Sequence, residues 1–160
     1  MTLPVHRVEW TVNASGISDI DVICDSLAWL IGDENIVEIE KTQSFHGSDI
    51  YLIRANADKK SVARKSLPRL GSSVLGQLQN EVINRIDSEN WLHLRINLDE
   101  LVCGNLVLVT PKELSENVKG RIKLELYPGD DKEKVAVKLL SEAADIAKRN
   151  NLPEPVKRLQ

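Results

Sequence analysis

Alternating apolar and polar residues predict a series of half-buried β-strands along the chain. In residues 5–12, Val8 and Trp10 share one face of the predicted strand, whereas Arg7 and Glu9 share the other. Comparable apolar runs predict five further strands, at residues 36–41, 50–55, 91–98, 105–110 and 118–127. The first two of these are separated by a polar segment that contains a glycine, so we expect them to form a long hairpin.

Apolar residues at helical spacing predict four helices, at residues 18–31, 58–67, 71–86 and 130–149. Ser18 is expected to cap the first helix through its hydroxyl group, and Gly32 is expected to end it. Pro68 is expected to end or kink the second helix, because proline lacks a backbone N–H and restricts the residue before it.

The order of these elements predicts an α+β fold. Helices follow groups of strands and several connections are short, so we expect a mainly antiparallel sheet of five to six strands with helices packed on one face. The opposite face is expected to display polar and charged side chains, namely Glu38, Arg54, His93 and Arg95. We expect a single domain over residues 1–151, followed by a flexible tail at residues 152–160.

Composition excludes several classes of protein. The chain has 160 residues, of which 42% are hydrophobic and 28% are charged, values typical of a globular domain. No apolar run is long enough for a membrane span and no secretion signal is recognisable, so we expect a cytoplasmic protein without membrane contact. The two cysteines, Cys24 and Cys103, provide neither a disulfide framework nor a zinc pattern.

The sequence contains no recognisable catalytic or metal-binding motif. His6, His46 and His93 are dispersed, and none has a second ligand at metal-site spacing. A glycine-rich phosphate loop and the signatures of nucleophilic hydrolases are also absent from the sequence. We therefore expect neither catalysis, nor a cofactor, nor a bound metal.

The net charge of −3 conceals an uneven distribution of charge. Residues 1–57 carry 3 basic and 9 acidic side chains, whereas residues 58–97 carry 7 basic and 4 acidic ones. The basic segment contains five candidate phosphate ligands, Lys59, Lys60, Arg64, Lys65 and Arg69. A solvated helix face is the more common explanation of such a run, and aromatic residues, which stack on bases, make up only 4% of the chain.

The stretch Gln43-Ser44-Phe45-His46-Gly47-Ser48-Asp49-Ile50, followed by an apolar strand and a basic helix, resembles a family of small archaeal proteins. That family carries a Gly-His-His-Gly-Asn-Pro-Ile-like loop between two strands. Here His46 and Gly47 match the loop, whereas Phe45 stands at its first histidine and Ser48-Asp49 replace Asn-Pro. Phe45, His46 and Gly47 are therefore candidate functional residues, although hairpin geometry with a positive φ at the glycine also explains the motif.

The resemblance implies both a fold and a function. Family members are described as RNA-binding proteins or predicted exosome subunits, and they look like dimers. Their fold is similar to the RNA-recognition-motif (RRM) type domain of the ribosomal protein that binds 5S ribosomal RNA. The first hypothesis is therefore a non-catalytic, RNA-associated accessory protein of the archaeal exosome machinery that binds RNA weakly.

Under this hypothesis RNA contacts the basic segment, with Arg54, His93 and Arg95 as further contacts on the sheet. The alternative is an RRM-like, dimerising protein-interaction module that does not bind RNA. The acidic net charge and the scarcity of aromatic residues favour this alternative.

Overall fold

The computed structural model describes residues 2–16, 18–110 and 116–155. Within this part of the chain, five strands form one antiparallel sheet in the order β2-β3-β1-β5-β4. The strands are β1 (Val5–Ser15), β2 (Val37–Gln43), β3 (Asp49–Ala57), β4 (Trp91–Asn97) and β5 (Asn117–Leu124). The expected α+β fold and the expected hairpin, formed by β2 and β3, are confirmed.

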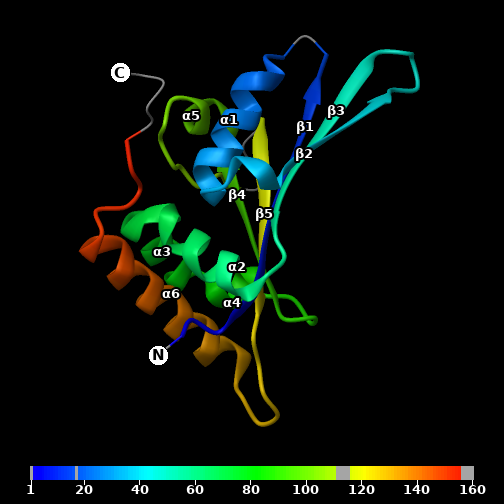
Figure 1. Ribbon diagram of the computed structural model, residues 1–160. Helices are drawn as coiled ribbons and strands as arrows, with labels where there is room; N and C mark the ends of the chain where they lie inside the picture. The colour runs from blue at the N-terminus through cyan, green and yellow to red at the C-terminus, as the bar shows by residue number, and fades with distance from the viewer. Residues whose placement is uncertain (1, 17, 111–115, 156–160) are drawn as a thin grey trace.

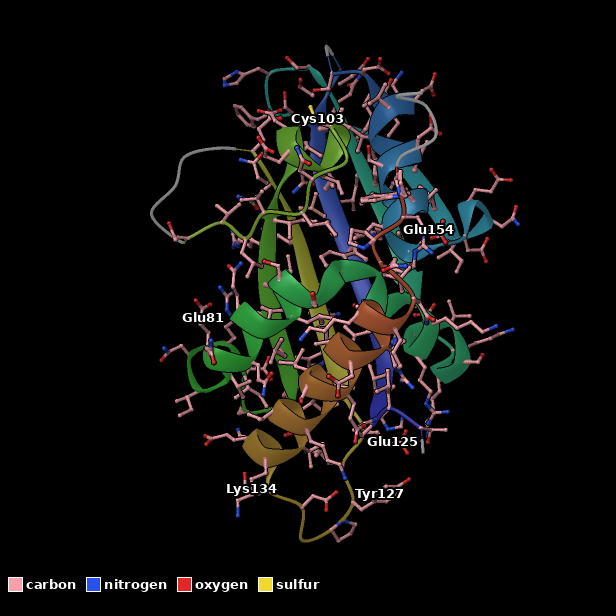
Figure 2. All side chains as sticks on the ribbon, turned by 90° about the vertical axis from the view of Figure 1, so that its left-hand side faces the viewer. Glu81, Cys103, Glu125, Tyr127, Lys134 and Glu154 are labelled. Carbon is pink, nitrogen blue, oxygen red and sulfur yellow. The ribbon has the colours of Figure 1, made fainter. Side chains whose placement is uncertain are left out.

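Helices cover one face of this sheet (Figure 1). They are α1 (Ile20–Ile31), η1 (Glu34–Ile36), α2 (Lys60–Ser66), η2 (Leu67–Leu70), α3 (Gly71–Asn80), α4 (Val82–Arg85), α5 (Leu98–Val102) and α6 (Lys132–Arg149). Figure 2 shows α3 and α6 lying across the front of the sheet. The hydrophobic core lies between the two layers and includes Trp10, Ile53 and Ile122 from the strands and Leu75 and Leu139 from the helices. We call the uncovered face of the sheet the open face.

Close packing between β1 and β5 fixes which side chains reach the open face. Gly120 lies opposite Trp10 in the β1–β5 register, and Trp10 is 1% exposed. A Cβ atom at position 120 would lie 2.3 Å from Cζ3 of Trp10, so only glycine accommodates the indole ring there. Because side chains alternate along a strand, Lys119 and Arg121, on either side of Gly120, point to the open face.

The boundaries of several helices differ from the expectation. Asp19, rather than Ser18, caps α1 through its side chain, whereas Gly32 ends the helix with a φ of 85°, as expected. Pro68 lies at the start of η2 and ends α2, as expected. The helix expected over residues 71–86 is interrupted and forms α3 and α4.

The prediction of a strand at residues 105–110 is wrong. The structure shows only an isolated bridge between Ile96 and Leu108, with hydrogen bonds from the N–H of Asn97 to the carbonyl of Val107 and from the N–H of Val109 to the carbonyl of Arg95. These contacts bring the segment alongside the edge of β4 without forming a regular ladder. The described sheet therefore has five strands, the lower end of the expected range.

The described part of the expected C-terminal tail contacts the helical layer. The backbone N–H of Leu152 donates to the carbonyl of Ala147 at 2.9 Å, and Nε1 of Trp29 donates to the carbonyl of Glu154 at 3.0 Å. Residues 156–160 lie outside the described residues, and the flexibility of the tail and the domain boundary at residue 151 stay predictions.

Candidate nucleic-acid interface

Four side chains from neighbouring strands form a row across the open face, which we call the basic row. Arg54 on β3 lies opposite Thr11 on β1, Thr11 lies opposite Lys119 on β5, and Lys119 lies opposite Arg95 on β4. Side chains directly opposite each other on one face are close enough to interact, and like charges in such positions destabilise a sheet. The pairing of Lys119 with Arg95 is therefore unfavourable unless an anion lies over it.

A second pair of cations lies opposite each other two rows further along the strands. Arg7 on β1 lies opposite Lys123 on β5. Between this pair and the basic row lies Glu9, which is only 8% exposed and accepts from Arg121 at 2.7 Å and from Arg7 at 2.9 Å. Arg7 also pairs with Asp58 at 2.5 Å, and this hydrogen bond raises the pKa of the guanidinium group. Glu9 therefore neutralises part of the charge and holds two arginine side chains in place.

The open-face positions of the described strands carry more basic than acidic side chains. The basic side chains are Arg7, Arg54, Arg95, Lys119, Arg121 and Lys123, and the acidic ones are Glu9, Glu38 and Glu40. Arg54 pairs with Glu40 at 3.3 Å. Within residues 2–16, 18–110 and 116–155, neither Arg95 nor Lys119 has a carboxylate within ion-pair distance. Arg95 and Lys119 are exposed and can bind a phosphate without breaking an ion pair among the described residues.

Trp91, at the start of β4, lies beneath two of these cations. The guanidinium carbon of Arg121 is 4.0 Å from the centroid of the indole ring, and Nζ of Lys123 is 5.3 Å from it. These cation–π contacts leave Trp91 only 8% exposed. Lys123 also donates to the carbonyl of Glu89, which fixes its amine beside the ring.

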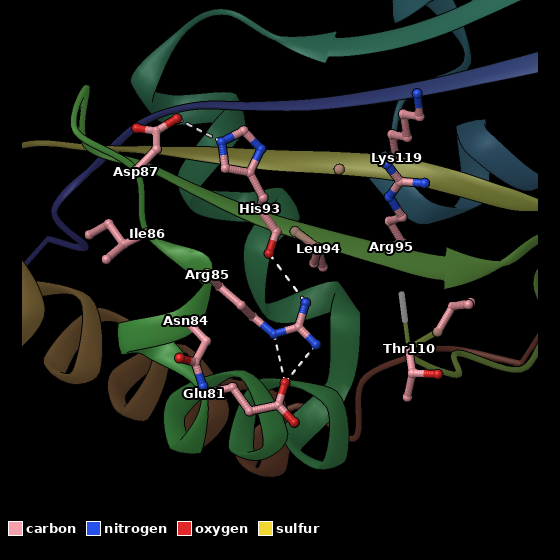
Figure 3. Close-up of a pocket in the computed structure, with 12 residues that line it drawn as sticks. Glu81, Asn84, Arg85, Ile86, Asp87, His93, Leu94, Arg95, Thr110 and Lys119 are labelled. Carbon is pink, nitrogen blue, oxygen red and sulfur yellow. Dashed lines mark hydrogen bonds and ion pairs between the residues drawn. The ribbon is translucent and has the colours of Figure 1, made fainter. Parts of the chain in front are cut away.

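His93 is paired with Asp87 at the edge of the open face (Figure 3). The distance between Nε2 of His93 and Oδ2 of Asp87 is 2.7 Å, and Asp87 also accepts from the backbone N–H groups of Trp91 and Glu89. The hydrogen bond to His93 and the two backbone hydrogen bonds lower the pKa of Asp87 to about 2. The carboxylate is therefore ionised at neutral pH and orients the imidazole ring.

Two adjacent hollows lie in this region of the surface. One, of about 510 Å³, lies over the open face and includes Arg54, Glu9 and Arg121 in its lining. The other, of about 660 Å³, extends past Arg95 to Arg85 and Glu81 near α4 (Figure 3). Lys119, Gly120 and His93 line both hollows, so the two are adjacent and together extend from β3 to the edge of β4. We call these two adjacent hollows the sheet groove.

The basic helical segment is divided among different roles. Arg69 donates from Nε and Nη2 to the carbonyl of Trp29, at 3.0 and 2.7 Å, and lies against Gly32. Lys59 and Lys65 are exposed to solvent. Arg69 therefore joins α1 to η2 in the helical layer and is not displayed with Arg54, His93 and Arg95 on the sheet.

Lys60 and Arg64 converge on a buried carboxylate. Glu125, which is 8% exposed, lies 3.2 Å from Lys60 and 3.3 Å from Arg64, and it accepts a hydrogen bond from the hydroxyl of Tyr127 at 2.6 Å. The Tyr127 hydrogen bond, with Lys60, lowers the pKa of Glu125, and the same bond raises the pKa of Tyr127. Figure 2 shows Glu125 and Tyr127 at the end of the molecule below α6. Lys60 and Arg64 therefore already have an anionic partner, Glu125.

The candidate loop lies at the tip of the β2–β3 hairpin, which projects from the body of the molecule (Figure 1). Phe45 is 99% exposed, and its ring contacts that of His46 edge to face at 5.4 Å. Gly47 has a φ of 83°, as the hairpin interpretation predicted. The loop joins β2 and β3 at one edge of the sheet. Arg95 lies on β4, at the opposite edge, and Lys119 lies on the neighbouring strand β5, so the loop is separated from both residues in the sheet.

The candidate contacts named from the sequence omit five residues of the open face, namely Arg7, Trp91, Lys119, Arg121 and Lys123. A signal for three of them exists in the sequence. Lys119, Arg121 and Lys123 occupy every second position of one strand, which places all three on the same face. The net charge of the surrounding segment conceals them, because residues 98–160 carry 11 basic and 11 acidic side chains.

Neither a metal site nor a membrane span is found in the part of the chain that the structure describes. No group of three or more His, Cys, Asp or Glu side chains there is placed to hold a metal ion. No described helix combines the length and the apolar character needed to cross a bilayer.

The fold and the open face define a class of protein: a small α+β domain with a basic groove on an uncovered antiparallel sheet. A family model described as RNA binding matches residues 7–124, and the chain belongs to this family. The matched region begins at Arg7 and ends at the last residue of β5, so it includes all the strands that form the sheet groove. No curated protein matches the chain in sequence.

Solved structures with the same fold come from archaea. Mth689, a DUF54 protein from Methanothermobacter thermautotrophicus, has a TM-score of 0.67 at 23% identity, with 88% of this chain and 98% of that chain covered. Protein AF2318 from Archaeglobus fulgidus has a TM-score of 0.67 at 18% identity, covering 87% and 99% of the two chains. Protein SSO0741 from Sulfolobus solfataricus has a TM-score of 0.62 at 19% identity, covering 85% and 98%. These similarities establish the shared fold.

Proposed function

We propose that this protein binds RNA through phosphate contacts in the sheet groove and does not catalyse a reaction. The observation that carries the proposal is the pairing of Lys119 with Arg95, for which the described residues provide no carboxylate partner and which a phosphate lying between the two cations would relieve. Arg54 extends the row toward β3, and Thr11 adds a hydroxyl group that can bond a phosphate oxygen. The membership of the chain in an RNA-binding family supports the same assignment.

The proposed binding is modest in strength and sensitive to salt. Glu9, Glu38 and Glu40 share the open face with the cations, and the whole chain has a net charge of −3. A small number of phosphate contacts, rather than a large basic surface, then provides the affinity. Such a protein suits an accessory role, in which other components supply tight binding or catalysis.

The finer proposal is an accessory protein of the archaeal, cytoplasmic RNA-processing machinery that associates with exosome subunits. Its support is the resemblance of residues 43–50 to the loop of the archaeal family. An RRM-like, dimerising interaction module is the second candidate. Ile39, which is 52% exposed, and Phe45, which is 99% exposed, favour it, because both lie on the projecting hairpin and offer apolar surface to a partner or a second copy.

Fluorescence anisotropy with a labelled single-stranded RNA tests the proposed function. If one phosphate lies between Lys119 and Arg95 and a second contacts Arg54, the logarithm of the binding constant should fall against the logarithm of the salt concentration with a slope of about −1.4, because each neutralised phosphate of a single strand contributes about −0.7. Absence of binding at ~50 mM salt, or binding unaffected by salt, would contradict the proposal. In that event co-purification and sedimentation would test the second candidate.

A further inference from the structure

We propose that the outer face of the Arg121 guanidinium group stacks on an unpaired nucleobase, with Trp91 supporting its inner face. This inference rests on the proposed function and specifies how the sheet groove would recognise RNA beyond its phosphates. The inferred ligand is single-stranded RNA, because a base within a duplex is already stacked on its neighbours. The proposed site is the stack Trp91–Arg121–base.

The contacts of Arg121 leave one face of its guanidinium group available. The guanidinium carbon lies 4.0 Å from the centroid of Trp91, so the indole ring covers one face. Nε and Nη2 both bond Oε1 of Glu9, each at 2.7 Å, so one edge of the group is also engaged. The Arg121 side chain is nevertheless 47% exposed. The side chain also lines the sheet groove, so we assign this exposure to its outer face, opposite Trp91.

The neighbouring residues hold this arrangement before any ligand binds. Asp87 accepts the backbone N–H of Trp91 at 3.0 Å and pairs with His93, which lies opposite Arg121 in the β4–β5 register. Glu9, from β1, is buried and fixes the other side of the guanidinium group. A planar group fixed in this way loses little conformational freedom when a base stacks on it.

The proposed phosphate contacts lie next to the stacking site on the sheet. Lys119 precedes Arg121 by two residues on β5, a distance of about 7 Å along the strand. A base on Arg121 and a neighbouring phosphate on Lys119 and Arg95 would thus be contacted by adjacent rows of the sheet. Stacking is tolerant of base identity, so we expect little sequence preference from this site.

The test compares a short intact single-stranded RNA with the same backbone made entirely abasic, by fluorescence anisotropy at low salt. The wild-type protein is expected to bind the intact strand about tenfold more tightly than the abasic strand. Arg121→Lys keeps the charge and removes the planar surface, so this preference should disappear while the salt dependence is retained. The matched control is Arg95→Lys, which changes an exposed arginine that lies opposite Lys119 and should keep the preference.

The outcomes separate this inference from the proposed function. Equal, salt-dependent binding of intact and abasic strands by the wild-type protein would overturn the stacking site and leave phosphate binding in place. A base preference that persists in Arg121→Lys, confirmed as folded by circular dichroism, would also overturn it. Absence of binding to either strand would overturn the proposed function and the inference together.

Discussion

Reversing the charges of Arg95 and Lys119 together, in Arg95→Glu/Lys119→Glu, is expected to weaken RNA binding roughly 100-fold at ~50 mM salt. Both side chains are exposed, lie opposite each other on β4 and β5, and line the sheet groove. Within the described residues neither forms an ion pair with a carboxylate, so the substitutions remove no such contact from the fold. Fluorescence anisotropy with a labelled single-stranded RNA measures the effect.

Lys59→Glu/Lys65→Glu is the matched control for this experiment. It changes the net charge by the same amount on α2 and just before it, where both lysines are exposed. Reversal of Lys60 and Arg64 would serve less well, because it would place new carboxylates beside Glu125. The sheet variant should lose binding and the helix control should change it less than about threefold. The opposite ranking would assign RNA binding to the helical segment.

Gly120→Ala is expected to destabilise the fold by about 3 kcal/mol, near the upper end of the usual range for overpacking of a core. The added Cβ would lie 2.3 Å from Cζ3 and 2.6 Å from Cε3 of Trp10, and the Trp10 ring is buried between the sheet and the helices. The melting temperature should fall by roughly 6–12 °C for a domain of this size. Thermal and urea unfolding, monitored by circular dichroism, measure the change.

The same substitution at Gly76 provides the control. Gly76 lies within α3, and a Cβ atom there would have no neighbour within 4 Å. Gly76→Ala should therefore stabilise the protein by about 0.5–1 kcal/mol, since alanine favours the helix. Equal stability of Gly120→Ala and the wild-type protein would show that Trp10 does not pack on β5 as described.

Local patterns in the sequence predicted most of the fold. The alternation around Val8 and Trp10, the hairpin around Gly47 and the end of α2 at Pro68 all depend on residues close in the chain. Such features are encoded by backbone preferences and by the need to bury one face of a strand or helix. The Trp10–Gly120 contact, by contrast, joins two strands far apart in sequence, and no local pattern contains it.

The apolar residues of segment 105–110 illustrate how local reasoning fails. Leu106 and Leu108 are partly buried against the core, as alternation suggests. Only Leu108 forms a bridge, to Ile96, and the pairing along the edge of β4 does not continue into a regular ladder. Burial and alternation therefore identified a packed segment correctly, but the hydrogen-bond pairing that defines a strand depends on the path of the neighbouring chain.

The candidate site was only partly predictable, for a related reason. Arg54, His93 and Arg95 were placed on the open face from alternation alone, and the structure brings them to the sheet groove. Arg64 and Arg69, in contrast, were proposed from the density of basic residues. The hydrogen bonds of Arg64 join α2 to Leu3 and Glu125, which flank β1 and β5, and those of Arg69 join η2 to α1. A count of charges along the chain does not show which cations have partners in space.

Nuclear magnetic resonance mapping of the RNA contact surface tests the central claim most directly. A short single-stranded RNA is titrated at low salt into the ¹⁵N-labelled full chain. The largest shifts in amide resonances are expected in β4 and β5, around Arg95, Lys119 and Arg121, with smaller shifts near Arg54 in β3. Shifts confined to α2 and η2, around Lys59 and Lys65, or the absence of any shift, would contradict RNA binding in the sheet groove.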